Sequence, residues 1–130
     1  MKERRKPTDA ELAILRVLWK RGPSTVREVA DTMRHQGAYT TVLKTLQIMT
    51  EKGLVSRDET ARTHVYAAAA SENQTQTQLV ADLLHRAFDG SASQLVLRAL
   101  EAGKSSPREL EEIRTLLDAH RRNKPRGGAS

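Results

Sequence analysis

The chain of 130 residues contains no cysteine, which excludes disulfides, thiolate metal sites and thiol catalysis. Aromatic residues make up only 3%, too few for the stacking platforms that bind single-stranded nucleic acids. We expect two of them, Trp19 and Tyr66, to be core or core-edge residues.

No apolar run approaches the roughly 18 residues of a membrane span. The basic start of the chain leads into an amphipathic pattern rather than the apolar core of a signal peptide. We therefore expect a cytoplasmic protein without membrane insertion.

Basic residues are abundant and unevenly distributed. Lys and Arg number 22 against 16 Asp and Glu, for a formal charge of +6. Residues 1–66 carry 13 basic and 8 acidic side chains, residues 67–120 carry 5 and 8, and residues 121–130 carry 4 and 0. The basic front half favours a polyanionic partner, although a basic excess alone can also serve solubility.

Two short helices are predicted at the front of the chain. Thr8–Glu11 and Thr25–Glu28 both have the capping-box spacing, in which a threonine hydroxyl and a glutamate satisfy free amides at a helix start. Gly22 lies beyond the end of the first helix. Apolar residues recur at helical spacing after each box, so each helix has one face for a core.

A third helix and a β-hairpin are predicted to follow. The helix runs from about Tyr39 or Thr40 to Lys52, and Gly53 is suited to end it. Residues 54–58 and 63–67 are short, partly alternating and rich in β-formers, which indicates an antiparallel hairpin with a long tip. Three helices followed by a hairpin, with a tight turn before the third helix, are typical of a winged helix-turn-helix domain.

The outward face of the third helix has the composition of a DNA-reading surface. Threonine methyls can meet thymine methyls, glutamine can pair with adenine, and basic side chains can meet phosphates. From the residues themselves we predict DNA contacts by eight side chains of the helix and hairpin: Tyr39, Thr40, Thr41, Lys44, Gln47, Lys52, Arg57 and Arg62.

The rear of the chain is predicted to be helical and to dimerise. A polar stretch, Ser71–Gln78, leads into a helix ending near Phe88, a fifth helix covers about 92–102, and Ser106–Glu109 is a capping box that opens a sixth. Broad apolar faces on short helices are best buried against a second copy. The predicted dimer residues are Leu79, Val80, Leu83, Leu84, Phe88, Leu95, Leu110, Ile113 and Leu117.

These patterns predict a mainly α protein with three parts. Residues 1–70 form the winged-helix domain, 71–120 a helical dimerisation domain, and 121–130 a disordered basic tail. The histidines lack metal-ligand spacing, and no phosphate loop or nucleophile motif occurs. We therefore expect no metal, no cofactor and no enzyme activity.

A series of short motifs runs in a fixed order over about residues 8–120: Thr8-x-x-Glu11-Leu12, Leu18-Trp19, Thr25–Val29, Ala38–Val42, Glu51–Val55, Arg62–Tyr66, Phe88–Ser91 and Leu95-Val96. In these motifs and their order the chain closely resembles the penicillinase-repressor (BlaI/MecI) family of bacterial transcriptional regulators. The resemblance implies a homodimeric repressor on a dyad-symmetric operator in double-stranded DNA. By position it also places Thr45 near the bases and the wing at residues 55–67.

Two features of the family are altered here. Antibiotic-responsive members are released from DNA by cleavage of an Asn-Phe bond promoted by a membrane sensor protease, whereas this chain has Arg98-Ala99 at the matching step. Copper-responsive members use Cys-x-Cys motifs, which a chain without cysteine lacks. A sensor protease stays a possible partner, and the alternative function is a winged-helix protein-interaction module that does not bind specific DNA.

Overall fold

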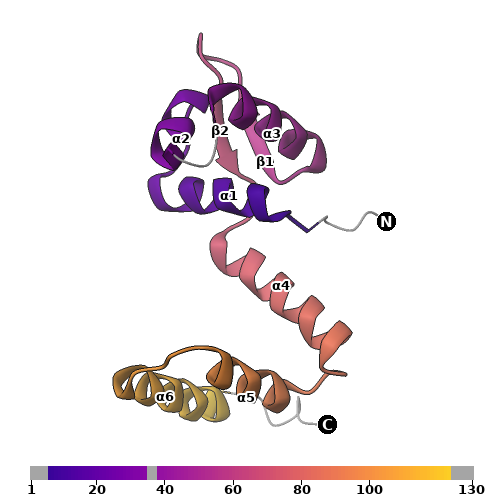
Figure 1. The fold of residues 1–130 in the computed structure, drawn as a ribbon, viewed down its shortest axis with the longest axis vertical. Coiled ribbons are helices and arrows are strands. Elements are labelled where there is room, and N and C mark those ends of the chain that lie inside the picture. Colours follow the sequence, from indigo (N-terminus) through magenta and orange to yellow (C-terminus); the bar gives the residue numbers. More distant parts are fainter. Residues whose placement is uncertain (1–5, 35–37, 124–130) are drawn as a thin grey trace. The chain divides into compact units, whose positions relative to one another are not determined.

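The computed structural model describes residues 6–34 and 38–123. It confirms a mainly helical fold with a winged-helix domain (Figure 1). The chain divides into two compact units between Asp82 and Leu83, later than the predicted boundary after residue 70. The described elements are α1 (Asp9–Arg21), α2 (Val26–Met33), α3 (Tyr39–Lys52), β1 (Val55–Asp58), β2 (Val65–Ala68), α4 (Glu72–Ala87), α5 (Ala92–Ala102) and α6 (Pro107–Asn123).

Both predicted capping boxes at the front of the chain are present. At α1, the Thr8 hydroxyl accepts the Glu11 N–H at 3.2 Å, and the Glu11 carboxylate accepts the Thr8 N–H at 2.9 Å. Thr25 and Glu28 repeat this arrangement at α2, with the same two distances. Each box satisfies two backbone N–H groups reciprocally, which defines where the helix begins.

The end of α3 turns the chain sharply into the hairpin. Gly53 has a φ of 81°, in the left-handed region. Its N–H bonds to Thr50 O at 3.2 Å, and the next N–H, of Leu54, bonds to Met49 O at 2.9 Å. These two bonds form a Schellman motif, so the connection from α3 to β1 is short and has a defined conformation.

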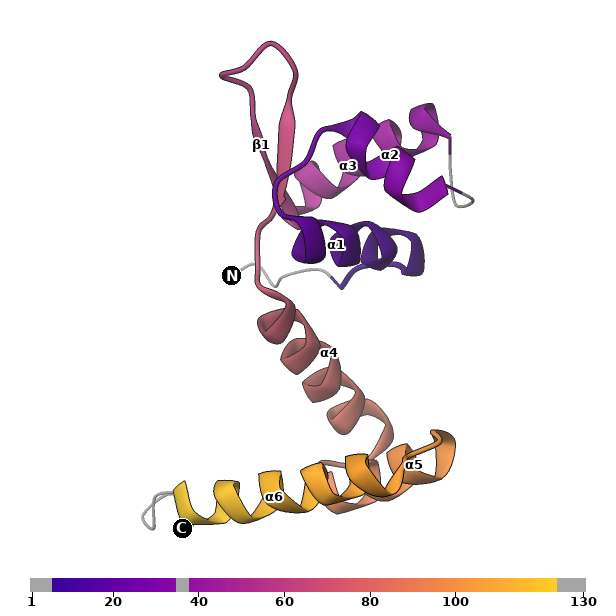
Figure 2. The same ribbon diagram turned by 90° about the vertical axis from the view of Figure 1, so that its left-hand side faces the viewer.

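The hairpin packs beside the first three helices. In its antiparallel register Val55 faces Ala68 and Asp58 faces Val65. Ser24, between α1 and α2, adds a bridge to Tyr66 through two backbone hydrogen bonds of 2.9 and 2.8 Å. Figure 2 shows the three helices on one side of the hairpin, whose loop projects beyond them.

One hydrophobic core lies between these helices and the hairpin. Tyr66 is 1% exposed at its centre, and Trp19 packs at its edge and donates its Nε1–H to Ala70 O at 3.0 Å. Both residues thus lie where the sequence predicted them. The buried apolar residues are Ile14, Leu15, Leu18, Val26, Val29, Ala30, Val42, Leu46, Met49, Leu54, Val55 and Tyr66.

The polar stretch Ser71–Gln78, predicted to lead into a helix, is itself helical from Glu72 onward. The Ser71 hydroxyl accepts the Gln74 N–H at 3.1 Å, and the Gln74 side chain accepts the Ser71 N–H at 2.9 Å. This capping box explains the earlier start, because it stabilises a first turn that buries little apolar surface.

The C-terminal end also differs from the prediction. The helix α6 continues to Asn123, so residues 121–123, expected in the disordered tail, are helical. Basic side chains in a last helical turn interact favourably with the helix dipole, which accounts for the longer helix. Residues 124–130 of the predicted tail lie outside the described residues.

Within residues 83–123, the second unit has helices but no core of its own. No residue from 83 to 123 is buried in this chain. Ser91 and Ser106 cap α5 and α6 by accepting the backbone N–H of Gln94 and Glu109, at 3.2 and 3.1 Å. These helices therefore begin where predicted, while their apolar side chains stay accessible.

Candidate nucleic-acid interface

The exposed face of α3 carries the polar side chains that the sequence singled out. Thr40, Thr41, Lys44 and Gln47 are all exposed, and Tyr39 at the helix start is 40% exposed. Residues three and four apart lie on one side of a helix, so these positions form one continuous surface along α3. We call this surface, from Thr40 to Gln47, the α3 polar face.

Two further residues modify this face. Thr45 is half-buried and donates its hydroxyl to Thr41 O at 2.8 Å, so only its methyl group and oxygen lone pairs are left for other contacts. Ile48 is 42% exposed and lies one turn after Lys44. The sequence interpretation missed Ile48 because it sought only polar residues there, although the i+4 spacing from Lys44 signals the same side of the helix.

A groove of about 410 Å³ opens beside the start of α3. Arg27, at the start of α2, places its guanidinium carbon 4.8 Å from the centroid of the Tyr39 ring, within the range of a cation–π contact. Arg27 was not among the predicted DNA contacts. Its position in the first turn of a predicted helix was the signal that the sequence offered. The groove is lined by Val26, Arg27, Tyr39, Leu43, Arg62, Thr63, His64 and Tyr66.

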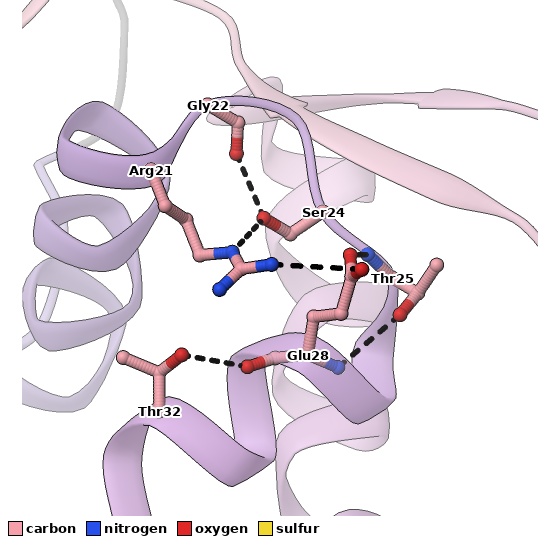
Figure 3. A network of polar contacts seen from close by, with 6 residues as sticks. All are labelled: Arg21, Gly22, Ser24, Thr25, Glu28 and Thr32. Carbon is pink, nitrogen blue, oxygen red and sulfur yellow. Dashed lines mark hydrogen bonds and ion pairs between the residues drawn. The ribbon is translucent and has the colours of Figure 1, made fainter.

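A polar network holds the start of α2 in place (Figure 3). Arg21 donates through Nε to the Ser24 hydroxyl at 2.9 Å, which in turn donates to Gly22 O at 2.8 Å. The Arg21 guanidinium also lies 3.5 Å from the Glu28 carboxylate. Because Ser24 is bridged to the hairpin, the network joins α1, α2 and the hairpin, and so positions Arg27 at the groove.

Two arginines of the hairpin differ in whether an acidic side chain already pairs with them. Arg62 is exposed in the loop, and no ion pair links it to an acidic side chain among the residues described. Arg57 pairs with Glu59 at 2.6 Å. The Tyr66 hydroxyl, followed by Glu59, raises the pKa of the Arg57 guanidinium above its ordinary value. Arg62 is therefore the readier of the two for an outside anion.

Lys52 lies outside both the α3 polar face and the lining of the groove. Its Nζ donates to both oxygens of the Glu11 carboxylate, at 2.9 and 2.8 Å, and its side chain is 19% exposed. Burial alone would raise the pKa of Glu11, but hydrogen bonds from Lys52 and Thr8 outweigh it, so the pKa is lowered. The charge of Lys52 is thus neutralised by Glu11 inside the domain. The sequence did not predict this pair, because the two residues lie 41 positions apart.

The described residues form neither a metal site nor a membrane-spanning helix. Across 6–34 and 38–123, no group of three or more His, Asp or Glu side chains is arranged to hold a metal ion. None of the helices in these ranges is both long enough and apolar enough to cross a membrane.

A winged helix that presents a polar third helix beside a basic groove is a helix-turn-helix DNA-binding domain. Residues 7–119 match the model of the penicillinase repressor family, and the chain belongs to that family. The family consists of transcriptional repressors and not enzymes, as expected from the sequence.

Individual relatives cover nearly the whole chain. "Transcriptional regulator BlaI" of Mycobacterium tuberculosis is 33% identical over 127 residues, covering 94% of this chain and 92% of the relative. The "Penicillinase repressor" of Bacillus licheniformis is 27% identical over 121 residues, covering 90% and 93%. A solution structure of the DNA-binding domain of the repressor BlaI is 26% identical, with a TM-score of 0.48, and covers 55% of this chain and 90% of that one.

Proposed function

We propose that this protein is a cytoplasmic transcriptional repressor that inserts α3 into the major groove of an operator. The observation that carries the proposal is the exposed α3 polar face next to the basic groove. Major-groove edges differ for each base pair and admit an α-helix. A face of small hydroxyl, amide and ammonium groups suits that task, whereas a protein-interaction module would present an apolar or acidic face.

The α3 polar face supplies the groups for direct reading of bases. Gln47 can bond adenine in a bidentate manner, and Lys44 can donate to guanine. The methyl groups of Thr41 and Thr45, together with the exposed Ile48, suit the thymine methyl. These five positions are therefore our candidates for specificity.

The groove supplies the groups for backbone contacts. Arg27, Tyr39 and Arg62 come from α2, α3 and the hairpin and line one opening. Ala38 provides no side-chain cap for α3, so the N–H groups of its first turn are available to a phosphate oxygen. Contacts of this type set the register of a protein on DNA without reading sequence. Lys52 is not included in this set, because it is paired with Glu11.

We also propose a homodimer, with an inverted repeat as the operator. The support is the apolar surface that this chain leaves accessible after Asp82: Leu83 is 47% exposed, Leu110 45% and Leu117 55%. Two recognition helices related by a two-fold axis need half-sites about one helical turn, or a multiple of it, apart. The other proposed dimer residues are the exposed Val80 and the half-buried Leu79, Leu84, Phe88, Leu95 and Ile113.

A membrane sensor protease is the proposed partner for release from DNA. The step that replaces the family's cleaved bond, Arg98-Ala99, lies in α5, and both residues are exposed. Arg98 also pairs with Glu101 on the same helix, at 2.6 Å. Cleavage there would divide the chain within α5, after the winged helix. Mass spectrometry of the protein from cells exposed to an inducer would detect the two fragments.

Fluorescence anisotropy with DNA from upstream of the protein's own gene tests the main proposal. Thr41→Ala and Lys44→Ala should each weaken binding by about 1–3 kcal/mol if they contact base edges. Gln76→Ala, on the exposed side of α4, is the matched control and should bind as the parent does. Equal binding by all four proteins would refute the assigned face.

Salt dependence and footprinting complete the test. Each neutralised phosphate should contribute roughly −0.9 to the slope of log K against log salt. Arg62→Ala should make that slope shallower by about one while leaving sequence preference intact. A protected region without dyad symmetry would contradict the proposed symmetric dimer.

A further inference from the structure

The end of α3 farthest from the groove is tied to α1 by a buried ion pair. Lys52, the last residue of α3, bonds both carboxylate oxygens of Glu11 in the first turn of α1, at 2.9 and 2.8 Å. Both helices lie wholly within the described residues, and these two bonds are the side-chain hydrogen bonds that join them. The pair is therefore the directional link between α1 and the recognition helix.

Glu11 is a rigid anchor for this link. Its side chain is 5% exposed, and one of its oxygens also accepts the Thr8 N–H at 2.9 Å within the capping box. The carboxylate is thus held from two sides, by the backbone that starts α1 and by Lys52. A buried, fully bonded group of this kind has one favourable geometry.

The remaining contact between the two helices is apolar. Leu15 and Leu18 of α1 share a core with Leu46 and Met49 of α3. Apolar burial has no preferred direction, and such cores tolerate repacking when volume is kept. Apolar contact therefore holds α3 against α1 but defines its angle less sharply than the ion pair does.

A small error in that angle is magnified at the DNA end. With 14 residues, α3 is about 20 Å long at roughly 1.5 Å per residue. A tilt of about 5° at Lys52 would move the Tyr39 end by nearly 2 Å, whereas binding groups must hold their geometry within roughly 0.5 Å.

We propose that Lys52 and Glu11 are positioning residues that set the angle of α3 and so determine how well the protein distinguishes its operator from other DNA. The inference rests on the proposed function and deepens it. Arg27 and Arg62, on other elements, keep their phosphate contacts when α3 tilts, so non-specific binding survives. The base contacts made by the α3 polar face are lost when α3 tilts.

The test separates positioning from stability through a ratio. Partial unfolding lowers the affinity for all DNA equally, so it leaves the ratio of operator to non-operator affinity unchanged. A misplaced α3 lowers that ratio. The variant Glu11→Gln/Lys52→Met removes both charges, while the introduced amide oxygen can still accept the Thr8 N–H, since glutamine also serves in capping boxes.

We expect this double variant to remain folded, because neutral replacements of buried ion pairs are often tolerated. Its ratio of operator to non-operator affinity should fall by about tenfold or more, the loss expected from one base contact. Lys52→Arg, which keeps the charge and a donor for Glu11, should retain most of the parent's ratio.

The outcomes separate the positioning role from the proposed function. If the parent binds its operator selectively and the folded double variant has the same ratio, the positioning role is refuted while the proposed function stands. If the parent shows no selectivity, the proposed function fails first. Should the double variant not fold, Glu11→Leu/Lys52→Met, an apolar pair of similar volume, provides the same comparison.

Discussion

The winged helix and residues 83–123 are both rich in capped helices, yet among the described residues only the winged helix has a core. In the first unit, three helices and a hairpin enclose apolar residues such as Leu46, which is 0% exposed. In the second, α5 and α6 have no buried residue, and Leu116 is 67% exposed. Helix formation and core formation are therefore separate properties of this sequence.

The second unit needs a partner to cover its apolar helix faces. Short helices are marginal in water and gain most of their stability from packing an apolar face. The winged helix obtains this packing within one chain through the hairpin and Ser24. The second unit obtains none of it within the described chain, and under our proposal a second copy provides it. Stability of the second unit should then depend on protein concentration.

The largest effect is expected from a charge placed on the apolar surface of α4. Leu83→Asp should abolish dimerisation, because each dimer would bury two unpaired carboxylates at a cost of about 6 kcal/mol or more, roughly 10⁴-fold in the dissociation constant. Sedimentation at micromolar concentration would detect the monomers. Gln78→Asp, with the same new charge at an exposed position of α4 that does not share the face of Leu83, is the control. A dimeric Leu83→Asp would show that the apolar surface of α4 does not form the dimer interface.

A truncation within the core of the winged helix is expected to come next. Leu46→Ala should lower the free energy of unfolding by about 2–5 kcal/mol, because it leaves a cavity in a closed core. The same truncation at Leu116 should change it by less than about 0.5 kcal/mol. Urea denaturation at two protein concentrations measures both. An equal loss at Leu116 that did not depend on protein concentration would show that the second unit has a core after all.

Local signals in the sequence predicted much of this contrast. The capping boxes at Thr8 and Thr25 placed the helix starts because all their partners lie within three residues. The box at Ser71 was missed because a polar stretch without apolar periodicity was interpreted as a connection. The winged-helix order followed from the elements themselves, since three helices and then a hairpin are typical of that domain.

Long-range contacts account for what the sequence did not predict. Lys52 and Glu11 lie 41 residues apart, and no local pattern distinguishes a buried lysine from a solvated one at a helix end. The contact between Arg27 and Tyr39 likewise joins two elements through the fold. The α3 polar face, by contrast, follows from helical spacing alone, which is why most of its residues were named in advance.

Acid should weaken the winged helix through Glu11. Its folded-state pKa lies below the ordinary value of 4.5, so on acidification the unfolded chain takes up this proton first. The contribution of Glu11 is therefore complete above about pH 4.5 and is lost as the pH falls through the lower folded value. Urea denaturation between pH 7 and pH 3 should show the parent losing its advantage over Glu11→Gln. A difference independent of pH would contradict the buried pairing.

The smallest predicted effect compares one glycine from each unit. Gly53 ends α3 with a φ of 81°, whereas Gly103 follows α5 with an extended φ of −100°. A Cβ at Gly53 would meet no atom within 4 Å, so Gly53→Ala tests backbone strain alone and should cost about 1 kcal/mol. Gly103→Ala, whose Cβ would lie 3.5 Å from Ala99 O, should be nearly neutral, since any residue adopts its conformation. Thermal unfolding measures both variants. If Gly53→Ala were as stable as the parent, the left-handed conformation between α3 and the hairpin would not impose the expected backbone strain.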